Sequence, residues 1–129
     1  YSIYQCVEAD IGTAGPYTYF AQLWKLLKTE HNQERPNPRR QFITNLQQEL
    51  LEVKRKGIEM ILMGDFNETL GSDTTLMGSI CANLDLAEAI DHFHPEAEDT
   101  PTYIRGQRRL DYCLISYSLL PKMSAAGIN

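Results

Sequence analysis

The chain has 129 residues, the size of one domain or of part of one. Its formal net charge of −5 excludes the overall positive excess of proteins that grip nucleic-acid phosphates without sequence preference. Hydrophobic residues make up 43%, enough for a packed core, and no apolar run approaches the roughly 18–20 residues of a membrane span.

The first half of the chain contains one strand pattern and two helix patterns. Residues 1–7 alternate as in a half-buried strand, and residues 8–16, with their glycines, proline and aspartate, predict a loop. Apolar residues recur at helical spacing over 17–31 and again over 39–56, which predicts two amphipathic helices. Gly57 stands where the C-terminal cap of the second helix belongs.

The second half begins with a short apolar run, Ile58 to Met63, which predicts a strand buried on both faces. Residues 69–73 read as a loop, 74–84 as a weaker helix and 87–99 as an irregular connection. Residues 109–116 alternate again and predict a further strand. Helix, glycine cap and buried strand in this order predict an α+β domain built in layers.

Three cysteines are widely spaced, at Cys6, Cys81 and Cys113, and no CxxC pair occurs. The odd number and the spacing argue against a disulfide framework and against a zinc knuckle. Free thiols persist in reducing compartments, so we expect an intracellular protein.

The buried strand runs directly into Gly64-Asp65-Phe66-Asn67-Glu68. The C-terminal end of a strand is where layered α/β sheets usually place their chemistry. Asp65 and Asn67, two residues apart, would point to the same side of an extended tip, where a carboxylate can orient water or bind a hard cation and an amide can donate to an oxyanion. This combination suits phosphate-ester hydrolysis, whereas ordinary turn formation explains Asp and Asn about equally well.

Asp111 lies inside the last strand, on the face shared with Cys113 and Ile115, where burial is expected. Buried carboxylates are rare unless they are paired. Two interpretations follow: Arg109, two residues away, satisfies Asp111, or Asp111 orients a catalytic histidine supplied from elsewhere.

Basic residues fall into three clusters, and we predict that the first two are solvated surface. The third, at Arg105, Arg108 and Arg109, is close to Asp111 and favours a polyanionic substrate. The first two clusters are Arg35 with Arg39 and Arg40, and Lys54 with Arg55 and Lys56.

Together, GDFNE at 64–68 and RLDYCLIS at 109–116 resemble the endonuclease/exonuclease/phosphatase superfamily, whose fold is DNase I-like. SIYQC near the N-terminus and PRRQF at 38–42 are most similar to the endonuclease domains of non-LTR retroelements. The resemblance implies an α+β fold that is part of a DNase I-like four-layer αββα sandwich. Residues 1–129 would form the central to C-terminal part of that domain, incomplete at both ends.

Carried over by position, the resemblance implies that Asp65 orients the attacking water and that Asn67 stabilises the phosphate. It implies that Asp111 hydrogen-bonds the catalytic histidine. The expected cofactor is Mg²⁺, with Mn²⁺ as the alternative. No residue is a certain metal ligand, and Asp65 and Asn67 are the candidates.

Three further positions are implied as substrate contacts: Tyr4, Thr102 and Arg105. Tyr4 would contact the phosphate. The alternative is that Tyr4 is an aromatic residue of the strand with no role in substrate binding. Thr102 and Arg105 fall in a segment that touches substrate in DNA-cleaving relatives, although a solvated loop accounts for them almost as well.

The sequence departs from the family pattern in ways that limit the expected activity. It lacks the Mg²⁺-binding Glu of the N-terminal half and the Asn of the first strand. It also lacks the final Ser-Asp-His, because none of His31, His92 and His94 follows Ser-Asp. A metal pair at His92 and His94 is less expected than a surface loop. We therefore expect little or no activity from residues 1–129 alone.

For the whole protein we expect a Mg²⁺-dependent phosphodiesterase that cleaves DNA. The alternatives are a phosphatase or sphingomyelinase-like member of the superfamily, and a non-catalytic remnant or nucleic-acid-binding module. Expected partners are DNA or another phosphodiester and a reverse transcriptase domain of the same polyprotein, with no membrane. The expected location is intracellular, with the nucleus as the candidate compartment.

Overall fold

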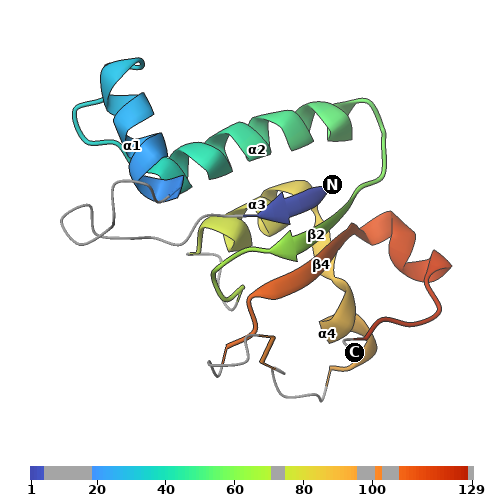
Figure 1. The fold of residues 1–129 in the computed structure, drawn as a ribbon. Coiled ribbons are helices and arrows are strands. Elements are labelled where there is room, and N and C mark those ends of the chain that lie inside the picture. Colours follow the sequence, from blue (N-terminus) through green and yellow to red (C-terminus); the bar gives the residue numbers. More distant parts are fainter. Residues whose placement is uncertain (5–18, 71–74, 96–100, 103–107, 128–129) are drawn as a thin grey trace.

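A computed structural model describes residues 1–4, 19–70, 75–95, 101–102 and 108–127. In chain order the elements are β1 (Ser2–Tyr4), α1 (Tyr19–Thr29), α2 (Pro38–Arg55), β2 (Ile61–Asp65), α3 (Leu76–Leu84), β3 (Leu86–Glu88), α4 (Ala89–Phe93), β4 (Asp111–Ser116) and the 3₁₀ helix η1 (Tyr117–Lys122). Four strands form one mixed sheet, with α1 and α2 to one side of it and α4 to the other in the view of Figure 1.

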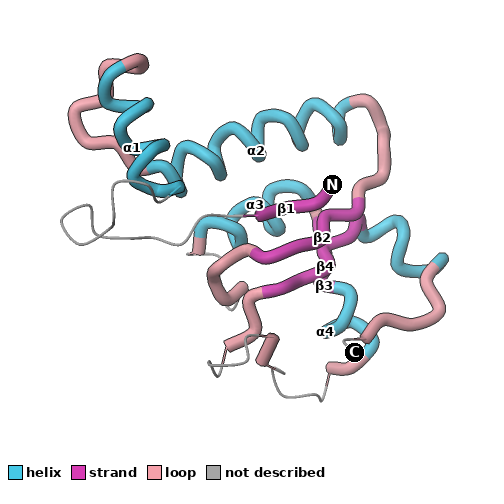
Figure 2. Tube along the Cα trace, in the orientation of Figure 1, coloured by secondary structure: helices cyan, strands magenta, loops and turns pink. Residues whose placement is uncertain are grey.

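The strands lie in the order β1-β2-β4-β3, as Figure 2 shows. β1 runs parallel to β2, and β4 is antiparallel to both β2 and β3. Strands distant in sequence are therefore neighbours in the sheet, and β2 and β4, which carry Asp65 and Asp111, lie side by side at its centre.

The core lies between this sheet and helices α2 and α3. Apolar side chains of both helices meet the strand residues on one face of the sheet, in keeping with a helix-on-sheet layer architecture. The buried apolar residues of this cluster are Ile3, Ile43, Leu46, Leu50, Met60, Leu62, Phe66, Met77, Ile80, Leu84, Leu86, Tyr112 and Leu114.

Helix α2 begins and ends where local chemistry dictates. The Asn37 side chain accepts a hydrogen bond from the Arg40 N–H, and Pro38 occupies the first helical position, which needs no donor. At the other end Gly57 has a φ of +71°, and its N–H donates to the Lys54 carbonyl at 2.9 Å. The predicted glycine cap is thereby confirmed.

The prediction that residues 58–63 form a strand buried on both faces is wrong. The strand begins only at Ile61, and Leu62 is fully buried whereas Ile61 and Met63 are 44% and 55% exposed. The reason is that α2 and α3 cover one face of the sheet only, so burial along β2 alternates with the pleat.

The segment 87–99, predicted to be irregular, contains the end of β3 and all of α4 within its described part. These elements are three and five residues long, too short to impose a readable hydrophobic period. The Glu88 side chain accepts a hydrogen bond from the Asp91 N–H and so caps α4.

Candidate active site

Asp65 at the end of β2 and Asp111 at the start of β4 are register partners across the sheet. The next pair along is hydrogen-bonded, since the Phe66 N–H donates to the Leu110 carbonyl at 2.8 Å. Antiparallel pairs alternate, so Asp65 and Asp111 form a non-hydrogen-bonded pair, the type with Cα atoms only about 4.5 Å apart. By the same alternation both carboxylates lie on the face of exposed Met63, opposite α2 and α3.

The parallel strand β1 extends this row, because Tyr4 is the register partner of Asp65. The side chain of Tyr4 lies outside the described part of the structure. Three strands thus bring Tyr4, Asp65 and Asp111 to adjoining positions at one edge of the sheet, although 60 or more residues separate the first from the others.

Gly64 makes the approach of β1 to β2 sterically allowed. A Cβ atom at this position would lie 1.8 Å from the Ile3 carbonyl oxygen, and Gly64 has a φ of +149°, a conformation that other residues rarely adopt. Only glycine both lacks the Cβ atom and adopts this φ readily. The glycine of the GDFNE segment is therefore needed to bring Tyr4 beside Asp65.

Asn67 adopts a left-handed conformation, with a φ of +49°. The Asp65 Oδ1 atom accepts a hydrogen bond from the Asn67 N–H at 2.9 Å, which closes an Asx-type turn. The ordinary turn chemistry and the catalytic interpretation are therefore compatible here, because one oxygen of Asp65 shapes the turn and a second oxygen remains on the same carboxylate.

Phe66 and Tyr112 anchor the two strand ends to the core. Phe66 is fully buried, and its ring centroid lies 5.9 Å from that of Tyr112. The Tyr112 hydroxyl donates to the Arg109 carbonyl at 2.7 Å and accepts from the Leu70 N–H at 3.3 Å. These contacts fix the residues that flank Asp65 and Asp111 on both strands.

The expectation that Asp111 is buried is wrong, and so is its pairing with the Arg109 guanidinium. Asp111 is exposed at the start of β4, although Ile115, further along the same face, is fully buried. The Arg109 side chain is 3% exposed and instead binds Glu88 at 2.5 Å and Asp91 at 2.8 Å. Burial alone would lower the pKa of Arg109, but these two carboxylates outweigh it and raise that pKa.

Two predictions made from the basic clusters are wrong, because the Arg109 and Arg39 side chains are buried in ion pairs. Arg109 does not offer its charge to a polyanionic substrate, because its guanidinium faces Glu88 and Asp91. Arg39, predicted to be solvated, has a side chain only 10% exposed and binds Glu68. Arg105 lies outside the described residues.

Sequence reasoning missed Arg39 and Glu68 as parts of this site. The Arg39 Nη2 atom donates to the Asn67 carbonyl and to Glu68, in both cases at 3.3 Å. One signal was available: a cation in the first turn of a helix opposes the helix dipole, so Arg39 directly after Pro38 needed an acidic partner.

Thr102 lies beside the start of β4, and its hydroxyl oxygen accepts hydrogen bonds from the N–H groups of Leu110 and Asp111, at 3.0 and 3.1 Å. The structure thus brings Thr102 to the same edge as Asp111. Its predicted substrate contact stays a prediction.

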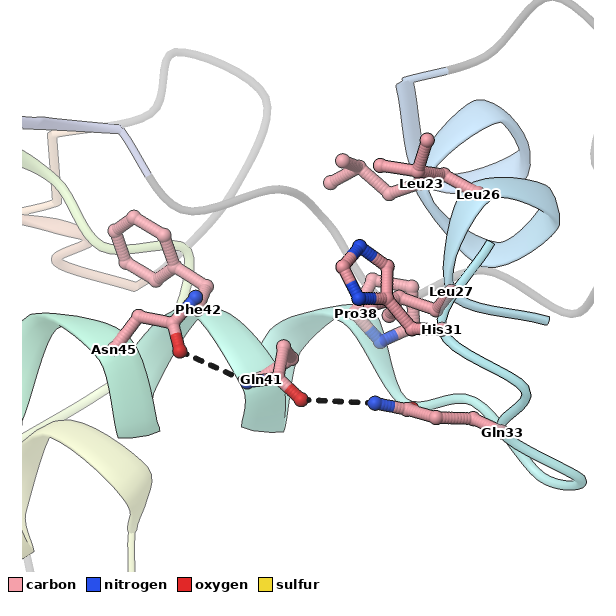
Figure 3. A pocket seen from close by; sticks show the side chains of 9 residues that line it. All are labelled: Leu23, Leu26, Leu27, His31, Gln33, Pro38, Gln41, Phe42 and Asn45. Carbon is pink, nitrogen blue, oxygen red and sulfur yellow. Dashed lines mark hydrogen bonds between the residues drawn. The ribbon is translucent and has the colours of Figure 1, made fainter. Parts of the chain in front are cut away.

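The histidines do not join this row. His94 Nε2 lies 2.8 Å from the Ala126 carbonyl oxygen, and the His92 ring packs edge-on against Phe93. His31 lines a separate cleft of about 620 Å³ between α1 and α2 (Figure 3). Within the described ranges, no three His, Cys, Asp or Glu side chains gather as a metal site.

That cleft is lined by apolar side chains of both helices and by a row of amides, among them Gln33, Gln41 and Asn45 (Figure 3). The Gln33 amide donates to Gln41 at 3.0 Å, and the Gln41 amide donates to Asn45 at 2.8 Å. Neither Asp65 nor Asp111 is among the residues lining the cleft.

Comparison with known proteins agrees with this geometry. Residues 5–129 match the family described as the endonuclease/exonuclease/phosphatase family, whereas no curated protein matches the chain. The mixed sheet with helices is consistent with part of the DNase I-like fold of that family, as predicted. Among the described helices, none has the length and apolar character of a membrane span. Since the match covers nearly the whole chain, this protein belongs to the endonuclease/exonuclease/phosphatase family of hydrolases.

Proposed function

We propose that this chain carries part of the active site of a metal-dependent phosphodiester hydrolase that cleaves DNA, of the retroelement endonuclease type. The observation that supports this most is the pair of Asp65 and Asp111, which are register partners directly opposite each other on β2 and β4. Like charges in directly opposed positions destabilise a sheet, and the turn closed by Asp65 does not explain the second carboxylate at Asp111.

The three polar residues divide the chemistry between them. Asp65 orients the attacking water by accepting a hydrogen bond from it, and the Asn67 amide donates to a phosphoryl oxygen as charge develops there. Asp111 holds the catalytic histidine in the correct tautomer and orientation. Tyr4, Thr102 and Arg105 contact the substrate around these groups.

The donor set fits a hard divalent cation, Mg²⁺ or Mn²⁺. Asp65 offers a carboxylate and Asn67 an amide oxygen, and Asp111 adds a second negative charge opposite Asp65. Mg²⁺ is commonly bound through one or two carboxylates while it keeps several waters. When bound, such an ion supplies Lewis-acid stabilisation of phosphoryl oxygens.

DNA is the proposed substrate because SIYQC and PRRQF resemble retroelement endonucleases. A reverse transcriptase domain in the same polyprotein and a nuclear location belong to the same proposal. Because the Arg109 guanidinium binds Glu88, the basic charge near Asp111 supports a DNA substrate less than the sequence pattern suggested.

A substrate panel tests the proposal on the full-length protein. Supercoiled plasmid, an inositol phosphate and sphingomyelin are each incubated with Mg²⁺, with and without EDTA. We expect EDTA-sensitive nicking of the plasmid and loss of that nicking in Asp65→Ala. Glu59→Gln is the matched control, because it removes an exposed carboxylate just before β2. Turnover of only a non-DNA substrate would point to the phosphatase or sphingomyelinase alternative, and no turnover of any substrate to a non-catalytic module.

A further inference from the structure

Arg39 and Glu68 form an ion pair that is almost fully shielded from solvent, with side chains 10% and 14% exposed. The Arg39 Nη2 atom lies 3.3 Å from Glu68 Oε2, and Glu68 Oε1 accepts a hydrogen bond from the Met77 N–H at 2.5 Å. Glu68, the residue after Asn67, is therefore linked to the first turn of α2 through Arg39 and to the first turn of α3 through Met77.

Arg39 also holds the backbone of Asn67 itself. Its guanidinium donates to the Asn67 carbonyl at 3.3 Å, while the Asp65 carboxylate accepts from the Asn67 N–H at 2.9 Å. Both backbone polar groups of Asn67 thus bind a charged side chain, and such hydrogen bonds are stronger than neutral ones. They hold a residue whose φ of +49° is uncommon outside glycine.

Stability alone gives little reason for an ion pair at this place. Replacing both members of a buried pair with uncharged residues is often neutral, because desolvation of the charges cancels much of their attraction. Arg39 also stands in the first turn of α2, where the helix dipole disfavours a cation. The pair is placed instead where it fixes the direction in which the Asn67 side chain leaves the backbone beside Asp65.

We propose that Arg39 and Glu68 are positioning residues, which lock Asn67 in its left-handed conformation so that its amide is held in register with Asp65. The proposal rests on the function proposed above for Asp65 and Asn67. Positioning errors of about 1 Å cost roughly 100-fold in rate, so this pair should affect turnover more than substrate binding.

The test uses three variants of the full-length protein: Arg39→Met, the double variant Arg39→Met with Glu68→Gln, and the control Arg40→Met. Glutamine keeps an acceptor for the Met77 N–H, and Arg40 is an exposed neighbour in the same helix turn. The single variant leaves a buried charge unpaired and should lower the melting temperature and the activity together.

In the double variant the melting temperature should return close to that of the wild type, whereas kcat for plasmid nicking should stay about 10- to 100-fold low with KM within about threefold. Recovery of kcat together with the melting temperature would overturn the inference, because the pair would then serve stability only. A double variant that fails to fold would overturn it as well.

A readout independent of activity separates this inference from the proposed function. Amide hydrogen exchange at Asn67 should become at least about tenfold faster in the double variant, while exchange at Leu114 in the core of β4 stays unchanged. Unchanged exchange at Asn67 would overturn the positioning role even in an active enzyme. If the wild-type protein hydrolyses nothing but Asn67 exchange responds as expected, only the proposed function fails.

Discussion

Gly64 lies so close to Ile3 that a Cβ atom on it would stand 1.8 Å from the Ile3 carbonyl oxygen. This close approach allows β1 to pair with β2 in the register that sets Tyr4 beside Asp65. The first residue of the GDFNE segment is therefore a steric requirement of the sheet, and the chemistry assigned to the following residues depends on it.

We predict that Gly64→Ala lowers the free energy of unfolding by at least about 3 kcal/mol, since it adds a backbone clash to an unfavourable φ. Urea denaturation measures the change. Gly57→Ala is the matched control, because its φ is +71° but nothing lies within 4 Å of the added Cβ, so only about 1 kcal/mol should be lost. Equal losses in the two variants would show that the contact with Ile3 is not tight.

Asp111→Asn should stabilise the protein in metal-free buffer while it lowers activity. The substitution removes one of two like charges that face each other across β2 and β4, and such pairs contribute about 0.2–1 kcal/mol. Urea denaturation in EDTA measures this gain. Added Mg²⁺ should then stabilise the wild type more than the variant, since a ligand stabilises the state that binds it. A variant less stable than the wild type in EDTA would contradict the paired-carboxylate arrangement.

Arg109→Met should destabilise the fold by about 3–5 kcal/mol, because it leaves the buried Glu88 carboxylate without its cationic partner. Arg108→Met, at an exposed neighbour, should change stability by less than about 0.5 kcal/mol. Thermal or urea denaturation of the two variants checks both values. A small effect of Arg109→Met would mean that Glu88 is solvated.

Burial raises the pKa of the Cys81 thiol to about 11, with smaller contributions from the Glu68 and Glu88 carboxylates. The thiolate is the reactive form, so alkylation of Cys81 in the folded protein should be slow at pH 8 and rise about tenfold per pH unit toward pH 11. Mass-spectrometric mapping after iodoacetamide treatment measures this rate, with urea-unfolded protein as the control. Equal rates at pH 8 in both states would contradict the burial of Cys81.

The same shift makes stability depend on pH. The folded pKa of Cys81 lies above the 9.0 of an unperturbed thiol, so the folded state holds its proton more tightly than the unfolded state. The stability that this group contributes is complete below about pH 9 and is lost as the pH rises toward 11. Cys81→Ala should remove this part of the alkaline decline, and an unchanged decline would assign it to other groups.

The features that could be predicted from the sequence are those with a local cause. Helix α2 and its glycine cap were predicted because the apolar spacing and Gly57 are signals that each act over a few neighbouring residues. The placement of Asp65 and Asn67 at the C-terminal end of a strand was predicted for the same reason, although that strand is buried on one face only. The three-residue strand β3 was missed, because it is defined by its pairing with β4 and not by its own pattern.

The features that could not be predicted depend on contacts between distant residues. Asp65 and Asp111 oppose each other only because β2 and β4 pair in one particular register. Arg39 is buried because Glu68, 29 residues away, meets it, and Arg109 is buried because Glu88 and Asp91 do the same. Runs of basic residues look alike in a sequence whether their charges are solvated or paired internally.

The most direct test of the central claim is a mutant cycle on plasmid nicking by the full-length protein with Mg²⁺, using Asp65→Asn, Asp111→Asn and the double variant. Residues that act as one catalytic unit give strongly non-additive losses. We predict that each single substitution lowers kcat by about 100-fold or more and that the double variant is little worse than either. Wild-type nicking by Asp65→Asn, or single losses that simply multiply in the double variant, would contradict a catalytic site formed by these two opposed carboxylates.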